Sequence, residues 1–266
     1  MLGNRFTALL AKRRNWVIPY VIFMMIFVIA PLFLIVYYAF TDAGGAFSTV
    51  NFRKFMIHPE AVNTFVYSVG IALITTLACL VLSYPAAWIL SRSESRTSRT
   101  VVMLFILPMW VNILIRTLAT VALFDFLDMP LGEGALIFGM IYNFLPFMLY
   151  PIYNTLQKMD KSLIEAAQDL GATPSQVFWK VILPLSMPGI MSGVIMVFMP
   201  TISTFAIAEL LTMNNIKLFG STIQENINNG MWNYGAALSL IMLLLMGITC
   251  LLGGDDDNNY NEGGLI

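Results

Sequence analysis

Long uninterrupted runs of apolar residues dominate the sequence and limit the folds that it can adopt. At about 1.5 Å per helical residue, six runs are long enough to cross about 30 Å of hydrocarbon. They cover residues 16–40, 64–90, 101–124, 135–156, 185–210 and 235–252. Inside lipid, a helix satisfies all its backbone hydrogen bonds within the segment itself. The sequence therefore predicts an all-α, polytopic membrane protein with six transmembrane helices in a single domain, residues 1–252.

The charge of the chain is low and supports a membrane location. Only 11% of its residues are charged and 58% are hydrophobic, whereas about a quarter of a soluble domain is charged. The net charge of -1 offers no basic surface for phosphates, so we expect contact with membrane lipid and none with nucleic acid. The acidic tail, 253–266, is short and polar and is predicted to be disordered.

The distribution of lysine and arginine predicts the orientation of the chain. Ten of the 14 lie before the first run or in the loops 91–100 and 157–184, and three lie in the loops on the opposite side. Loops rich in these residues stay in the cytoplasm. Both termini are therefore predicted to be cytoplasmic.

The loop 157–184 contains signals for two short helices. Residues 162–170 are good helix formers, and their apolar members recur at helical spacing: Leu163, Ala166, Ala167 and Leu170. Gly171 follows where a left-handed cap favours glycine. Thr173 and Pro174 are typical of an N-cap and a first helical turn. The second helix is expected to place Val177, Val181 and Ile182 on one side and to stop at Pro184.

Two interpretations of this hairpin are possible from the residues alone. It could simply join two spans as a surface hairpin. A short helix with a mixed apolar and charged face could equally dock into a groove on a partner protein.

The same loop resembles a family motif. Glu165-Ala166-Ala167, Gly171 and Leu183-Pro184 match the EAA signature of ABC importer permeases of the binding-protein-dependent, MetI-like type I class. The resemblance implies a coupling helix that inserts into a nucleotide-binding subunit. The residues to which it assigns ATPase coupling are Glu165, Ala166, Ala167, Asp169, Gly171, Leu183 and Pro184.

Further segments extend the resemblance to the polyamine-importing members of this family. Residues 107–119, 142–172 and 183–193 look like their spermidine/putrescine permease subunits, within a similarity that covers roughly residues 60–250. Two features depart from it: the loop 125–134 is shorter than expected, and the C-terminal tail is acidic.

The resemblance also implies the surroundings of the chain. The expected partners are an ATPase dimer, a second and non-identical homologous permease, and an extracytoplasmic polyamine-binding protein, in the plasma membrane of a prokaryote. The chain has no glycine-rich phosphate loop, so it is expected to be no enzyme and to bind no cofactor, with ATP and Mg on the partner ATPase.

A polyamine pathway needs carboxylates for its ammonium groups and aromatic faces for cation–π contacts. Glu209, near the end of the fifth run, is the strongest candidate because acids inside spans are usually functional, although a hydrated helix end is the alternative. The other candidates could instead serve helix packing or an interfacial aromatic belt: Trp110, Asn112, Tyr142, Asn143 and Tyr150. Arg116 should not contact a cation directly, and we expect it to pair with an acid such as Asp125 or to bind between helices.

Other functions remain open at this stage. The cargo could be ferric iron, thiamine, phosphonate or another small solute, because the EAA loop is shared among these permeases. A secondary transporter would show inverted repeats or paired intramembrane charges, and neither is evident in the sequence. A membrane enzyme is disfavoured because His58 is the only histidine.

Overall fold

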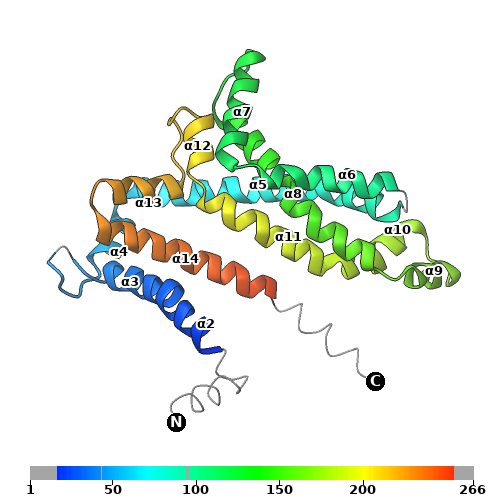
Figure 1. Cartoon of the computed structure of the whole chain (residues 1–266), viewed down its shortest axis with the longest axis horizontal. Helices are drawn as coiled ribbons and strands as arrows, with labels where there is room; N and C mark the ends of the chain where they lie inside the picture. The colour runs from blue at the N-terminus through cyan, green and yellow to red at the C-terminus, as the bar shows by residue number, and fades with distance from the viewer. Residues whose placement is uncertain (1–16, 43, 94–95, 255–266) are drawn as a thin grey trace, which may run out of the picture. The chain divides into compact units, whose positions relative to one another are not determined.

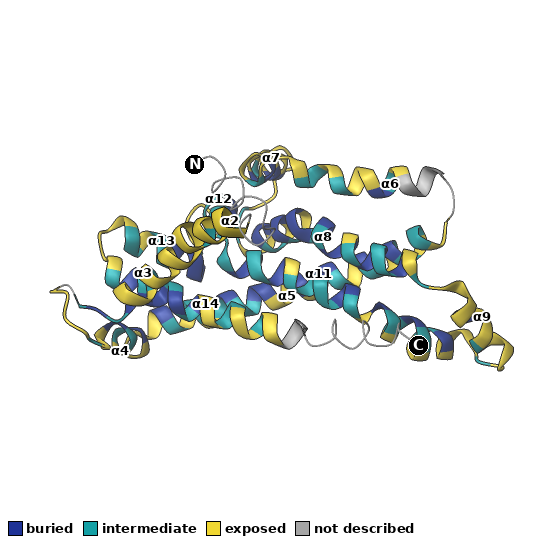
Figure 2. Ribbon diagram, turned by 60° about the horizontal axis from the view of Figure 1, so that its bottom comes forward, coloured by how far each residue is buried: buried dark blue, intermediate teal, exposed yellow. Residues whose placement is uncertain are grey.

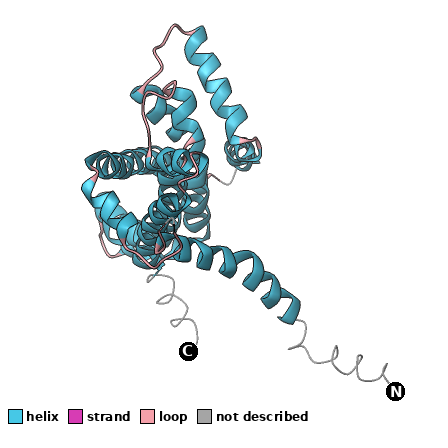
Figure 3. Cartoon of the chain, turned by 90° about the vertical axis from the view of Figure 1, so that its left-hand side faces the viewer, coloured by secondary structure: helices cyan, strands magenta, loops and turns pink. Residues whose placement is uncertain are grey.

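The computed structural model describes residues 17–42, 44–93 and 96–254, and its regular elements are helices (Figures 1 and 3). Within those ranges the only β feature is an isolated bridge between Thr41 and Phe47. Five helices are long and apolar enough to cross a membrane, and a bent helix pair raises the number to six. The all-α, multi-span prediction is therefore confirmed. The acidic tail from Asp255 onward lies outside the described residues.

The chain forms two compact units, and the smaller one combines residues up to His58 with residues 225–243. Its first span, Val17–Ala39, runs through α2 (Val17–Met24), the π-helical segment η2 (Met25–Ile29) and α3 (Ala30–Ala39). The short helix α4 (Val50–Ile57) follows a turn. This unit also contains the end of α13 (Phe219–Asn228) and the first part of α14 (Trp232–Gly254).

Two asparagines hold the end of α3 within this unit. The buried Asn51 Nδ2 donates to the carbonyls of Ala39 (3.1 Å) and Thr41 (2.9 Å). Asn233 Nδ2, at the start of α14, donates to the Tyr38 carbonyl within α3 at 3.3 Å and to the Thr41 carbonyl at 2.9 Å. The last carbonyls of a helix have no partner within it, so these two amides cap α3.

The larger unit covers Pro59–Gln224 and the residues from Leu244 onward. Three long helices run side by side at its centre: α5 (Pro59–Arg92), α8 (Glu133–Lys158) and α11 (Leu183–Ser203) (Figure 1). Figure 2 shows the buried surface concentrated on their facing sides. Their core includes the fully buried Cys79, Met148, Ile152 and Val197.

Two glycines set the close approach of α8 and α11. A Cβ atom on Gly189 would lie 2.5 Å from Thr155 Oγ1, and one on Gly193 would lie 2.7 Å from Met148 Sδ. Real Cβ atoms do not approach so closely, so larger residues would push the helices apart. A pair of small residues four positions apart is a common way for membrane helices to pack without a hydrophobic driving force.

The third apolar run, 101–124, is sharply bent between two helices. Helix α6 (Arg96–Ile106) tightens into the 3₁₀ turn η3 (Leu107–Trp110), and α7 (Ile113–Phe126) then departs at 100°. Val111 and Asn112 have extended ψ angles of 137° and 134°. Pro108 is part of the tight turn, and Asn112 starts a new helix because its Oδ1 accepts from the Leu114 amide at 2.8 Å.

The fifth run is also interrupted, so the predicted helix 185–210 is two helices. Helix α11 ends at Ser203, and the short α12 (Ala206–Leu211) follows. Pro200 removes a backbone donor near this end, and Ser203 Oγ bonds to the carbonyls of Met199 (3.0 Å) and Pro200 (3.2 Å). Thr204 then turns to an extended conformation with ψ of 143°.

Candidate functional site

The segment 160–184 forms a helical hairpin at one end of the three-helix core (Figure 1). Its first helix, α9 (Lys161–Asp169), begins at Asp160, whose carboxylate accepts from the Ser162 amide at 2.9 Å. This hydrogen bond lowers the pKa of the exposed Asp160 carboxyl, because it stabilises the charged form. The start of the hairpin is therefore fixed by a local contact.

The turn of the hairpin is a Schellman motif centred on Gly171, as the sequence predicts. Gly171 has φ of +82°, in the left-handed region that favours glycine. Its amide donates to the Gln168 carbonyl at 2.8 Å, and the Ala172 amide donates to the Ala167 carbonyl at 3.1 Å. No atom would meet a Cβ at Gly171 within 4 Å, so a larger residue would strain only the backbone.

A capping box starts the second half of the hairpin. Thr173 Oγ1 accepts from the Gln176 amide at 3.4 Å, and Gln176 Oε1 accepts from the Thr173 amide at 2.9 Å. Helix α10 (Pro174–Val177) follows, with proline in its first turn. Both N-terminal signals in the sequence are therefore used.

The second helix does not stop at Pro184, contrary to the sequence prediction. Helix α10 passes into the π-helical segment η4 (Phe178–Ile182) and then directly into α11, so that residues 174–203 form one helix. The Leu183 amide donates to the Phe178 carbonyl in the wider π pattern. Pro184 lies in the first turn of α11, where the register has just changed and a missing amide is tolerated.

The hairpin has a buried side and an exposed side. Ile164 and Val177 join the core, together with Ile182, whereas Leu163 and Leu170 are 47% and 89% exposed. The apolar spacing of α9 did not indicate which side meets the core, and these two leucines face outward with Trp179 (63% exposed). Five residues of the predicted coupling set are also exposed: Glu165, Ala166, Asp169, Gly171 and Pro184.

Aromatic and hydroxyl contacts fix the hairpin to the core. Tyr84, on α5, has its hydroxyl 3.0 Å from Ser186 Oγ, and Ser186 Oγ donates to the Leu183 carbonyl at 2.9 Å. Since the serine proton is used in that bond, Tyr84 is the donor to Ser186. The Tyr84 ring also meets Phe178 edge-on at 5.9 Å. The sequence analysis missed this link, because no local pattern pairs residues 102 positions apart.

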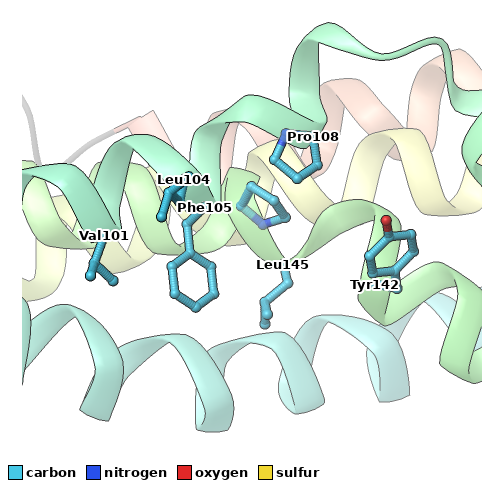
Figure 4. Close-up of a pocket in the computed structure, with 7 residues that line it drawn as sticks. Val101, Leu104, Phe105, Pro108, Tyr142 and Leu145 are labelled. Carbon is cyan, nitrogen blue, oxygen red and sulfur yellow. The ribbon is translucent and has the colours of Figure 1, made fainter.

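The bent third run opens a groove beside α8. Its inner part, about 350 Å³, is lined by Val101, Leu104, Phe105, Pro108, Tyr142, Leu145 and Pro146. In Figure 4 the side chains of Phe105 and Leu145 lie close to each other, and Tyr142 lies opposite Pro108. An adjoining part of about 630 Å³ extends past Trp110 to Arg116 and Ala119. Pro108 and the Asn112 cap are the sequence signals that could have indicated this bend.

The predicted pathway residues form two groups: exposed aromatic side chains, and asparagines that are used within the helices. Trp110 is 83% exposed and lines the larger groove with Tyr142. Tyr150 is exposed farther along α8. Asn112 is occupied as the cap of α7, and Asn143 is fully buried with its Nδ2 bonded to the Gly139 carbonyl at 2.8 Å. Both amides therefore serve the fold of the span: Asn112 caps α7 from an exposed position, and Asn143 is buried.

Glu209 lies in the first turn of α12 and is half-buried. Its neighbours Ile207 and Ala208 face the core, and Ile207 and Leu211 approach Gly139 on α8. Glu209 does not belong to the long helix of the fifth run, since α11 has ended six residues earlier. It occupies a short helix beside α8.

Arg116 has the least expected position of the charged residues. It is 6% exposed, on the first turn of α7. Its Nη1 lies 3.5 Å from the Asn143 carbonyl, a long contact, and its Nε has no hydrogen-bond partner. The expected pairing with Asp125 is not formed: Asp125 is nine residues farther along α7, and no carboxylate of the described chain lies within ion-pair distance. The alternative, a position between helices, fits its contact with α8.

The chain is similar to a known protein family and to several known transport proteins. Residues 80–254 match the model of a family described as "Binding-protein-dependent transport system inner membrane component". The chain is 34% identical to the spermidine/putrescine transport system permease protein PotB of Escherichia coli K12, over 86% of this chain and 92% of that protein. It is 34% identical to PotB of Salmonella typhimurium SL1344 (91% and 93%) and 31% identical to PotB of Haemophilus influenzae (93% of both).

Solved structures with the same fold are also found. A subunit of a bacterial ABC transporter involved in the import of alginate superposes with a TM-score of 0.68 over 96% of this chain and 99% of that chain, at 16% identity. A chain of the inward-facing MetNI methionine ABC transporter gives a TM-score of 0.54 over 77% and 96%, at 19% identity. At these identities the likeness concerns the fold.

Proposed function

The chain belongs to the family of binding-protein-dependent transport system inner membrane components, and we propose that it is the permease subunit of an ATP-driven importer of polyamines. In this proposal it forms half of the pathway, and a second, homologous permease subunit forms the other half. An extracytoplasmic binding protein delivers spermidine or putrescine, and a dimer of ATPase subunits holds ATP and Mg. The chain itself performs no covalent chemistry and is a multi-pass component of a prokaryotic inner membrane.

The observation that carries this proposal is the hairpin of α9 and α10. It exposes Glu165, Leu170 and Trp179 on a base fixed by buried Ile164 and Val177. An exposed apolar and charged surface on a rigid base is suited to docking in a groove of a partner. Residues 174–203 form one helix, about 45 Å long at the usual rise. A displacement of the docked hairpin would therefore move α11 directly, because no loop separates the two.

The cargo proposal rests on the sequence relatives and on the groups available for a flexible cation. All three relatives described above are spermidine/putrescine permeases. The exposed rings of Trp110 and Tyr142 offer cation–π contacts and apolar faces for methylene groups. Glu209 supplies a half-buried carboxylate, and Tyr150 is an exposed ring of the same helix as Tyr142. We propose these four residues as the pathway-lining set.

Reconstitution tests the function directly. The chain, its second permease and its ATPase would be placed in proteoliposomes with the binding protein and ATP, and uptake of labelled spermidine would be measured. Competition by putrescine, with none by thiamine or ferric iron, supports a polyamine importer. ATP-dependent uptake of one of the other solutes would retain the importer and overturn the cargo. No ATP-dependent uptake of any solute would overturn the function.

A variant in the same assay tests Glu209. Glu209→Gln keeps the size of the side chain and removes its charge, so we expect spermidine uptake at low concentration to fall about fivefold, which corresponds to about 1 kcal/mol, the upper value for an exposed ion pair. Glu225→Gln, on α13, is the matched control and should transport normally. Unchanged apparent affinity and rate in Glu209→Gln would remove Glu209 from the pathway.

A further inference from the structure

Arg116 presents a buried guanidinium whose hydrogen-bonding capacity is largely unused. The residue is 6% exposed, its Nη1 contact with the Asn143 carbonyl is 3.5 Å long, and its Nε has no partner. The side-chain Oδ1 of Asn143 also has no hydrogen-bond partner. Buried charges in proteins are normally paired and hydrogen-bonded, so this site lacks an anion.

The level of the site along α8 restricts where that anion can come from. Asn143 follows Glu133, the first residue of α8, by ten positions and precedes Lys158, the last, by fifteen. At the helical rise it lies roughly 15 Å and roughly 22 Å from the two ends. Whichever end faces the cytoplasm, the guanidinium lies well below the level of lipid phosphates in a bilayer with a hydrocarbon core of about 30 Å.

The surroundings of Arg116 are open on one side and apolar. It lines the groove of about 630 Å³ together with Leu107, Trp110, Val111, Ile115 and Tyr142. Within the described part of the chain, no carboxylate is close enough to form an ion pair with it. The groove is therefore open to a group from outside the chain, and its one charge is positive.

We propose that Arg116 receives a carboxylate from a membrane span of the second permease subunit. The planar guanidinium can offer Nε–H and Nη–H together, which matches the two oxygens of an aspartate or glutamate. A side chain from another span can reach this depth, whereas a lipid phosphate would have to leave the interface. Pairing would also neutralise the positive charge that otherwise repels a polyamine from the nearby Trp110 and Tyr142. The inference rests on the proposed function, which supplies the second permease.

Co-purification of the complex from membranes tests the proposal. A tag on this chain would recover the second permease from wild type and from Arg116→Met, Arg116→Glu and Ile115→Met. Arg116→Glu would place a second negative charge against the partner's carboxylate and should reduce recovery about tenfold. Arg116→Met would leave that carboxylate unpaired and should reduce recovery by a smaller factor. Ile115→Met changes an exposed neighbour in the same groove and should recover the partner normally. The amount of tagged chain in the membrane is compared first, so that only inserted protein is scored.

Charge exchange keeps the proposal testable if the single variants insert poorly. In the Arg116→Glu background, each aspartate and glutamate in the spans of the second permease is changed to lysine in turn. Restored recovery and uptake with one of these changes supports the proposal and identifies the carboxylate. It is overturned if none restores recovery, or if Arg116→Met recovers the second permease at the wild-type level.

Three outcomes separate this inference from its alternatives and from the proposed function. Quantification of co-purified phospholipid could show that Arg116→Met loses an anionic lipid and keeps the second permease, which would replace the carboxylate by a lipid. Normal assembly and uptake in Arg116→Met, with an active wild type, would overturn only the present inference. A wild-type complex without ATP-dependent uptake would overturn the proposed function itself.

Discussion

The hairpin and the third span each change direction at a short break between helices, at residues 170–173 and 111–112. In the hairpin, the amides of Gly171, Ala172 and Thr173 are all satisfied by groups between Ala167 and Gln176. In the third span, the Asn112 cap fixes where α7 starts, and α7 then packs against α8 and α12. A hairpin closed by its own neighbours can keep its shape while it moves with a partner. The direction of α7 depends on what surrounds it, which includes any group that enters the groove.

The largest effect is expected where the hairpin meets the core. Ile164→Ala removes a buried side chain (8% exposed) and should destabilise the docking of α9 by about 2–3 kcal/mol, the lower part of the range for truncating a buried isoleucine to alanine. Hydrogen exchange of the α9 amides in detergent would measure this. Leu163→Ala, at the exposed neighbouring position, should leave exchange unchanged and weaken binding of the ATPase. Equal exchange in both variants would show that the hairpin is not held by its buried side.

The next effect concerns the left-handed turn. Gly171→Val forces a branched residue to φ of +82°, at a cost of about 1–2 kcal/mol. Because the turn orients α9, we expect uptake per ATP hydrolysed to fall about tenfold, the factor that corresponds to 1.4 kcal/mol. The ratio of labelled cargo to released phosphate in proteoliposomes measures it.

The matched control for this change is Gly230→Val. Gly230 has φ of +77° and the same pair of Schellman hydrogen bonds, with its amide on the Ile227 carbonyl and the Met231 amide on the Asn226 carbonyl. Valine at position 230 would therefore impose the same backbone strain at another turn. Coupling should be lost in Gly171→Val and retained in Gly230→Val. Equal losses would mean that strain anywhere in the chain impairs transport and that the hairpin has no special part.

The helix caps at the two breaks allow a direct comparison between them. Thr173→Ala and Asn112→Ala each remove one N-cap side chain, worth about 1 kcal/mol. In the hairpin the loss should appear as faster amide exchange in residues 174–177. In the third span the bend should persist, because packing on α8 and α12 directs α7, and spin-label distances across the bend should stay unchanged. A straightened third span in Asn112→Ala would show that this break is also determined locally.

The smallest effect is expected at the link between α5 and the hairpin. Tyr84→Phe and Ser186→Ala break the same 3.0 Å contact, so their effects on unfolding free energy should not add. The coupling energy should be about 0.6 kcal/mol, the average for hydrogen bonds between membrane helices. Ser192→Ala, whose hydroxyl bonds within α11 to the Pro188 carbonyl, is the control and should combine additively with Tyr84→Phe. Additive effects of the first pair would exclude the link.

The sequence predicted the hairpin turn because its determinants are close together. Gly171, Thr173, Pro174 and Gln176 act through bonds that span at most five positions, so the residue types are sufficient to place them. It failed at Pro184, where the π-helical segment η4 changes the register and lets the helix continue. It left open which side of α9 meets the core, because spacing alone cannot decide this for a short helix, and the structure turns Ile164 inward and Leu163 and Leu170 outward.

The candidate pathway was less predictable from sequence than the hairpin. From the sequence, Asn143 could line the pathway or serve helix packing, and the structure favours packing, because Asn143 is fully buried and bonds within its own helix. Glu209 was placed at the end of a long span and lies instead in the separate helix α12. Both outcomes depend on contacts with other helices, which residue type and spacing do not encode.

The sequence by itself determined that the chain is helical and membrane-spanning, and where the hairpin turns. Backbone hydrogen bonding in lipid and short-range capping both act within a segment, so they can be inferred from the segment alone. Only the tertiary structure decided that the third run bends by 100°, that α12 separates from α11, and that Arg116 is buried with its Nε unpaired. These features arise from packing between helices far apart in the chain, where the arrangement depends on complementary shapes and on groups that no single segment contains.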